Sequence, residues 1–183
     1  MSQAKNLPTI SKVLLKDIQP KDILSKLPFE KKKCPLFISS NGNATSLYRY
    51  SNSGSFIELS DLLSNNLIPA LKFSISKGVF CNINFGSIQD LKEIDTMLTR
   101  FKQLCDAVHK DLYNHILRNT LMMQDYSEFM KIIPFDPIHE MVPEIFDNSK
   151  QTFRFLFFVQ IEDENVSISE SMTSLFECIR VEP

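Results

Sequence analysis

The sequence has no Trp, only four Gly and four Cys, and no apolar run of membrane-spanning length. A bilayer requires about 20 consecutive apolar residues, so a transmembrane helix is not expected. Four glycines leave few places where a backbone can approach a phosphate group closely. The glycine-rich nucleotide motifs GxxxxGK[ST] and GxGxxG are absent from the sequence. Recognisable nucleotide-binding enzymes are therefore excluded at the level of motifs.

The four cysteines lie at long and irregular intervals, and none forms a CxxC pair. This spacing does not indicate a disulfide framework, although two bridges are formally possible. Residues 1–10 carry one Lys and no apolar signal segment. We therefore expect an intracellular, cytoplasmic protein with reduced thiols.

Charge is unevenly distributed along the chain, although the formal net charge is only −2. Residues 1–33 hold eight Lys and three acidic residues, whereas residues 134–183 hold three basic and ten acidic residues. A pI of about 5.9 argues against a dedicated nucleic-acid-binding protein. The opposite charges at the two ends of the chain either steer a partner towards the protein or form two separately solvated surfaces.

Composition divides the chain into a basic, partly flexible arm over residues 1–33 and a single domain over residues 34–183. The arm has one short helical segment between Pro20 and Pro28 and too little apolar surface to fold alone. We therefore expect it either to be mobile or to dock on the domain.

Several segments of the domain have the pattern of β-strands. Asn41-Gly42 is a strong hairpin signal, and it predicts paired strands over residues 36–38 and 46–50. Residues 79–85 alternate between apolar and polar residues, which predicts a half-buried strand. Residues 153–161 are rich in aromatic and β-branched residues, and residues 175–181 predict a short last strand.

The most legible helix is predicted over about residues 88–118, where apolar residues recur at spacings of three and four. We expect its apolar stripe to be buried within the fold, and the stripe consists of Leu91, Ile94, Leu98, Phe101, Cys105, Val108 and Leu112. Shorter helices are predicted over residues 67–77, where Gly78 is suited to end the helix, and over residues 126–133 and 137–145. Strands at both ends of the chain and helices between them predict an α+β fold. We expect a mostly antiparallel sheet, formed by the N- and C-terminal strands and packed on the central helices.

The residues that could act in catalysis or in metal binding do not occur in the pattern of a known site. Cys105 and His109 are four residues apart, but Cys105 lies on the apolar stripe, where a thiol is inert. Asp111 and His115 supply two of the three or more protein ligands that a zinc site needs. The acidic run 162–165 lacks the alternating ligands of a calcium loop. We therefore predict no catalytic residues, no metal and no cofactor.

With no catalytic constellation, we expect a non-enzymatic adaptor, chaperone or subunit of a larger complex that binds another protein, in a homo- or hetero-oligomer. The strand 153–161 is apolar on both faces, and helices on one side of a two-layer domain leave Leu156 and Phe158 uncovered unless the arm covers them. The acidic residues Glu162, Asp163 and Glu164 would form a rim that favours a basic partner.

Two alternatives stay open. A small nucleic-acid-binding domain of the oligonucleotide-binding type would use basic and aromatic side chains. The candidates are Lys31, Lys32, Lys33, Tyr48, Arg49 and Tyr50. The other alternative is an enzyme with dispersed active-site residues.

Overall fold

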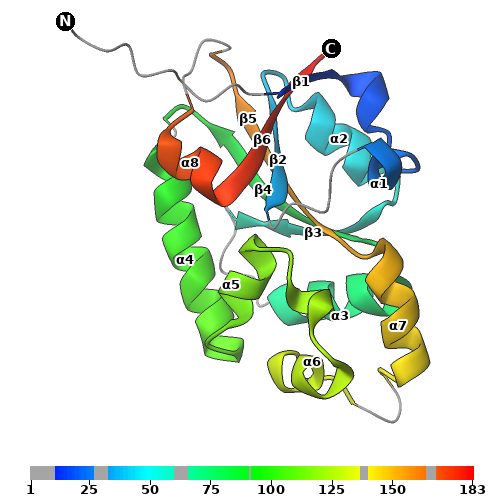
Figure 1. The fold of residues 1–183 in the computed structure, drawn as a ribbon. Helices are drawn as coiled ribbons and strands as arrows, with labels where there is room; N and C mark the ends of the chain where they lie inside the picture. Colours follow the sequence, from blue (N-terminus) through cyan, green and yellow to red (C-terminus); the bar gives the residue numbers. More distant parts are fainter. Residues whose placement is uncertain (1–10, 27–32, 60–65, 91, 137–139, 164–167) are drawn as a thin grey trace, which may run out of the picture.

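A computed structural model describes residues 11–26, 33–59, 66–90, 92–136, 140–163 and 168–183 of the chain. Its centre is a six-stranded sheet in the order β1-β6-β2-β5-β4-β3, and every pair of neighbouring strands is parallel. Helices cover both faces of this sheet (Figure 1). The fold is therefore α/β, and the expected antiparallel α+β sheet is wrong.

The strands are β1 (Ser11–Leu14), β2 (Cys34–Ser39), β3 (Gly54–Glu58), β4 (Phe80–Ile88), β5 (Phe155–Ile161) and β6 (Phe176–Glu182). The α-helices are α1 (Ile23–Lys26), α2 (Asn43–Tyr50), α3 (Leu67–Lys77), α4 (Lys92–Val108), α5 (Leu112–Leu117), α6 (Tyr126–Ile132), α7 (Pro143–Thr152) and α8 (Glu170–Leu175). Two 3-10 helices, η1 (Leu15–Ile18) and η3 (Leu121–Met123), complete the described elements.

The predicted hairpin at Asn41-Gly42 is instead the start of helix α2. Gly42 does have the positive φ, 69°, that the hairpin signal requires. However, the Asn41 Oδ1 accepts a hydrogen bond from the Asn43 N–H at 3.1 Å, which turns the chain into a helix. Ala44 and Tyr48 are both fully buried, whereas Ser46, which a strand would place on the same face, is exposed, so a helix places this segment's apolar groups on the sheet.

The sheet separates two apolar cores. On the α2 face, η1, α1 and α2 cover Phe37, Leu156 and Phe158. On the opposite α4 face, residues of α3 to α8 cover the remaining inward side chains of the central strands. A parallel sheet needs this double cover, because each connection between its strands is a helical crossover on one face.

The long predicted helix is divided into two. Helix α4 ends at Val108 and α5 begins at Leu112, so the apolar stripe crosses a bend. The predicted burial is confirmed for Ile94, Leu98, Phe101, Cys105 and Leu112, whereas Val108 is partly buried. Leu91 lies outside the described residues.

Part of the basic arm belongs to the sheet. Strand β1 pairs with β6, and Ile18 and Ile23 are buried on the α2 face. The Tyr48 hydroxyl donates to the Ile18 carbonyl at 2.9 Å, which ties the arm to α2. Residues 11–26 are thus docked on the domain, the second of the two alternatives for the arm. Within the described ranges, none of the helices combines the length and the apolar character needed to cross a bilayer.

Candidate ligand-binding site

The order of the strands creates one place where neighbouring connections leave in opposite directions. Strands β2 and β5 are adjacent, yet the chain after β2 enters α2 on one face and the chain after β5 leads to α8 on the other. In open α/β sheets, ligands bind in the crevice outside the carboxyl ends of the strands at such a switch point. The carboxyl ends of β2 and β5 are therefore the first place to search for a site.

A cavity of about 300 Å³ lies there on the α2 face, and we call it the polar cavity. Every described residue that lines it is polar or a glycine. The side chains that line it include Thr45, Ser46, Arg49, Asn84, Ser87 and Gln160. Thr45, Ser46 and Arg49 follow Gly42 by three, four and seven residues, so they lie on one face of α2. This face of the helix lines the cavity.

Two of the four glycines in the chain line this cavity, and both have positive φ. Gly42, at the start of α2, has φ 69°, and Gly86, near the end of β4, has φ 80°. A Cβ atom on Gly42 would lie 2.7 Å from the Gln160 Oε1, so the bare backbone leaves room for this amide. Gly86 sits where the β4–β5 register shifts between Asn84 and Ser87. Such irregularities re-aim side chains at the ends of strands.

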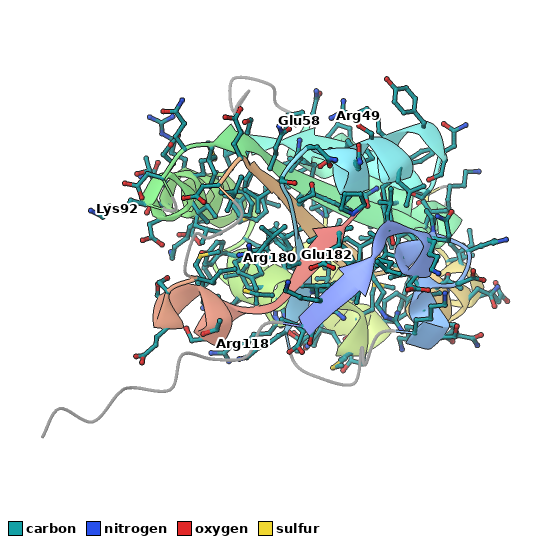
Figure 2. All side chains as sticks on the ribbon, turned by 90° about the horizontal axis from the view of Figure 1, so that it is seen from above. Arg49, Glu58, Lys92, Arg118, Arg180 and Glu182 are labelled. Carbon is teal, nitrogen blue, oxygen red and sulfur yellow. The ribbon has the colours of Figure 1, made fainter. Side chains whose placement is uncertain are left out.

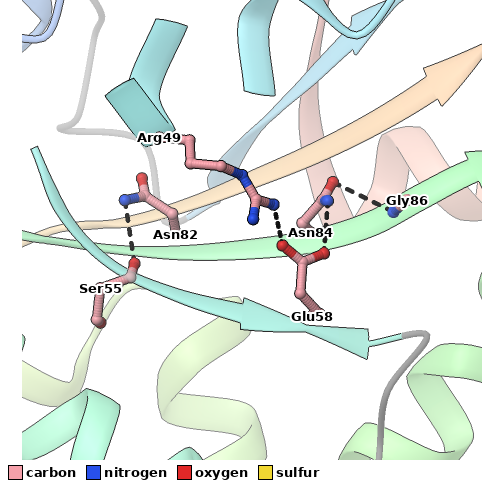
Figure 3. A network of polar contacts seen from close by, with 6 residues as sticks. All are labelled: Arg49, Ser55, Glu58, Asn82, Asn84 and Gly86. Carbon is pink, nitrogen blue, oxygen red and sulfur yellow. Dashed lines mark hydrogen bonds and ion pairs between the residues drawn. The ribbon is translucent and has the colours of Figure 1, made fainter. Parts of the chain in front are cut away.

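A network of polar contacts holds Arg49 at the cavity (Figure 3). The Arg49 guanidinium forms an ion pair with the Glu58 Oε1. The other carboxylate oxygen accepts a hydrogen bond from the Asn84 Nδ2 at 2.7 Å, and the Asn84 Oδ1 accepts one from the Gly86 N–H at 3.2 Å. The chain of contacts thus links the orientation of a partly exposed arginine to a buried amide of the sheet.

Buried amides on β4 are a departure from the predicted half-buried strand. Asn82 is fully buried and Asn84 is 6% exposed, because α2 covers the face of β4 that was expected to meet solvent. The Asn82 Nδ2 donates to the Ser55 carbonyl at 3.1 Å, while its Oδ1 has no partner among the described residues. An unpartnered buried amide oxygen costs roughly 1–3 kcal/mol. Asn82 is therefore costly for stability, whereas both amide groups of Asn84 are paired and its Nδ2 holds Glu58.

The residues expected to bind a protein partner are not on one surface. Leu156 and Phe158 are both fully buried, and the Phe158 ring lies 5.0 Å from that of Tyr48 and 5.3 Å from that of Phe37. This face of β5 is therefore covered by η1 and α1 of the arm together with α2, which is the alternative left open for the arm, and it forms no exposed apolar patch. Glu162 and Asp163 are exposed after β5, and Glu164 lies outside the described residues.

The candidates for nucleic-acid binding are also dispersed. Lys33 precedes β2 at the amino edge of the sheet, where its Nζ donates to the Thr173 carbonyl at 2.7 Å. Tyr48 is buried and cannot stack on a base, whereas Tyr50 is 83% exposed. Arg49 is the member of this set that lines the polar cavity. Lys31 and Lys32 lie outside the described residues.

The remaining chemical candidates do not form a site. Burial raises the pKa of the Cys105 thiol well above its usual range, which leaves it protonated and unreactive. The His109 Nδ1 accepts a hydrogen bond from the Asp111 N–H at 3.2 Å, and the His115 Nδ1 lies 3.0 Å from the Thr120 Oγ1. Within the described part of the chain, no three His, Cys, Asp or Glu residues are grouped so that they could hold a metal ion.

Comparison of the chain with the models of known protein families, with curated proteins and with solved structures gave no match. The site must therefore be interpreted from its own geometry and chemistry.

Proposed function

We propose that this protein is a small-molecule-binding domain, and that its polar cavity holds a ligand through a phosphate or sulfate group. The observation that carries the proposal is the position of Arg49. Its guanidinium is paired with Glu58, whose other carboxylate oxygen accepts from Asn84, and it lies among hydroxyl and amide side chains beside the switch point of a parallel sheet.

The chemistry of the lining favours an oxyanion. A guanidinium has five N–H donors and matches the oxygens of phosphate and sulfate, so its contact with Glu58 leaves further donors. The hydroxyl groups of Thr45, Ser46 and Ser87 add donors at the same cavity. Helix α2 also begins there, which directs the positive end of its dipole toward a bound anion. The described lining includes no aromatic ring on which a base would stack.

The same residues favour binding over turnover. A guanidinium is a poor general acid or base, so Arg49 is suited to binding and not to proton transfer. The Glu58 carboxylate is already engaged by both Arg49 and Asn84. Arg49, the charged residue in the described lining of the cavity, is therefore suited to hold a ligand in place.

Calorimetric titration with inorganic phosphate, sulfate and glycerol phosphate tests the proposal, with chloride and glycerol as controls at matched ionic strength. A ligand present at 100 times its Kd adds about 2.7 kcal/mol to the free energy of unfolding. For a chain of this size, that gain raises the Tm by roughly 5–10 °C. Glycerol should produce no such shift, because it lacks the oxyanion.

The variant Arg49→Gln should bind the oxyanion roughly 10–100-fold more weakly, because a charge-assisted hydrogen bond contributes about 1.5–3 kcal/mol. The matched control is Arg118→Gln, since Arg118 is an exposed arginine at the end of α5 (Figure 2). Equal affinities in the two variants, or no oxyanion binding by the unmodified protein, would overturn the proposal.

Binding of a partner protein by an adaptor or complex subunit stays a prediction. Its expected apolar surface is buried, so the described structure no longer favours a particular location for it.

A further inference from the structure

A second and larger cavity lies at the carboxyl ends of β1, β6, β2 and β5, and we call it the charged cavity. Its volume of about 410 Å³ falls within the roughly 300–1,000 Å³ of small-molecule sites. The lining side chains used in the argument are Lys12, Leu14, Ile38, Ile161, Arg180 and Glu182. The side chains of this set lie on the α4 face, opposite to the polar cavity, so this cavity is separate from the proposed oxyanion site.

The charged cavity exists because the helical cover of β6 ends before the strand does. Phe176 and Cys178 project into the core of the α4 face and are buried. The next two residues on that face, Arg180 and Glu182, are only partly buried. Figure 2, which views the molecule from above, shows both of them on β6 and apart from Arg49 and Glu58.

The register of the strands places opposite charges beside apolar groups. Arg180 lies between Lys12 on β1 and Ile38 on β2, and Glu182 is paired with Leu14 on β1. The Lys12 Nζ and the Glu182 Oε1 are 2.7 Å apart. Basic and acidic groups therefore meet within one hydrogen-bond length at the edge of an apolar floor.

Two further features complete the set of groups. Ile161, at the end of β5, is 4% exposed and extends the apolar floor that Ile38 begins. Asp163 adds a second carboxylate to the lining, so that two basic and two acidic side chains surround the cavity. Arg180 and Asp163 each have an interaction partner in the unliganded protein, so a ligand must exchange with existing contacts.

We propose that the charged cavity binds a small zwitterion with an apolar body, namely an α-amino acid with an aliphatic or aromatic side chain. Such a molecule carries its carboxylate and ammonium on one carbon, so it can replace the direct ion pair of Lys12 and Glu182 with one contact to each of these groups. The ligand carboxylate contacts Arg180 and Lys12, and its ammonium contacts Glu182 and Asp163. Its side chain covers Ile38. A ligand with a single charge matches only half of these groups.

Titration of the full chain with L-leucine and L-phenylalanine tests this proposal by calorimetry and by saturation-transfer NMR. Isocaproate and isopentylamine are the matched probes, since they keep the apolar body of leucine and lack its ammonium or its carboxylate. Glycine keeps both charges and lacks the apolar body. We expect each of these three probes to bind at least about tenfold more weakly than L-leucine, a difference of one decade in Kd.

Two variants locate the site. Arg180→Gln and Glu182→Gln should each weaken L-leucine binding about tenfold or more, because each removes a charged partner of the ligand. Arg118→Gln and Arg49→Gln should leave it unchanged. Glu182 lies on the last strand with 43% of its side chain exposed, so its variant serves as the test if Arg180→Gln does not fold.

The outcomes decide the proposal independently of the oxyanion site. It is overturned if neither amino acid binds with a Kd below ~10 mM, if the singly charged probes bind as tightly, or if both variants on β6 retain full affinity. Loss of amino-acid binding in Arg49→Gln would place the ligand in the polar cavity, and this result would also refute the proposal for the charged cavity. Phosphate binding that persists in Arg180→Gln would leave the proposed function intact.

Discussion

The core of the α2 face should depend strongly on Phe158. Its side chain is fully buried, and its ring lies 5.3, 5.0 and 6.1 Å from the rings of Phe37, Tyr48 and Phe56. Replacing a buried Phe by Ala removes the apolar transfer energy and leaves a cavity, at a typical cost of 3–5 kcal/mol. Since three aromatic neighbours lose contacts at once, we expect Phe158→Ala to fall within that range. The Tm should decrease by roughly 6–20 °C.

The matched control is Phe73→Ala, because Phe73 lies on α3 with 53% of its surface exposed. Its cost should stay within about 0.5 kcal/mol, as for most surface substitutions. Urea denaturation followed by circular dichroism measures the two free energies of unfolding. If Phe158→Ala were no less stable than Phe73→Ala, the α2 face of β5 would be open to solvent. The burial of the predicted partner surface would then be refuted.

Three further predictions concern the remaining core. Leu98→Ala should destabilise the protein by about 2–5 kcal/mol, whereas Arg100→Ala on the exposed side of the same helix should be nearly neutral in thermal melts. Tyr48→Phe should cost about 1 kcal/mol in urea denaturation, because it removes the hydrogen bond to the Ile18 carbonyl; an unchanged midpoint would show that the arm is not tied there. Burial raises the pKa of the Cys81 thiol to about 12, so we expect it to react with a thiol reagent near pH 8 only after unfolding; fast labelling of the native protein by mass spectrometry would contradict its burial.

Local features of the fold were predictable where neighbours in the sequence determine them. Gly78 was expected to end a helix, and it does so after α3 with φ 61°, because only glycine adopts that conformation without cost. The stripe containing Leu98 and Phe101 was expected to be buried, and both residues are. Apolar groups spaced at three and four residues lie on one face of a helix whatever the rest of the chain does.

The direction of the strands was missed although one segment carried a signal for it. Strand β5, Phe155–Ile161, is apolar on both faces, and such a continuous run is typical of parallel strands covered by helices on each side. An antiparallel sheet was expected instead from strands at both ends of the chain with helices between them, and the Asn41-Gly42 hairpin signal agreed with it. That signal reports a positive φ at Gly42, which an entry into a helix satisfies as well as a hairpin does.

The sequence by itself thus determined where α3, α4, α6, β4 and β5 lie, since these depend on periodicities of a few residues, whereas it predicted a strand in place of α2. The candidate site depended on the tertiary structure. Arg49, Asn84 and Gln160 are far apart along the chain, and parallel pairing of β2, β5 and β4 brings them to one cavity. No local pattern specifies which strands become neighbours. That choice is made by the burial of both sheet faces at once, a property of the whole chain.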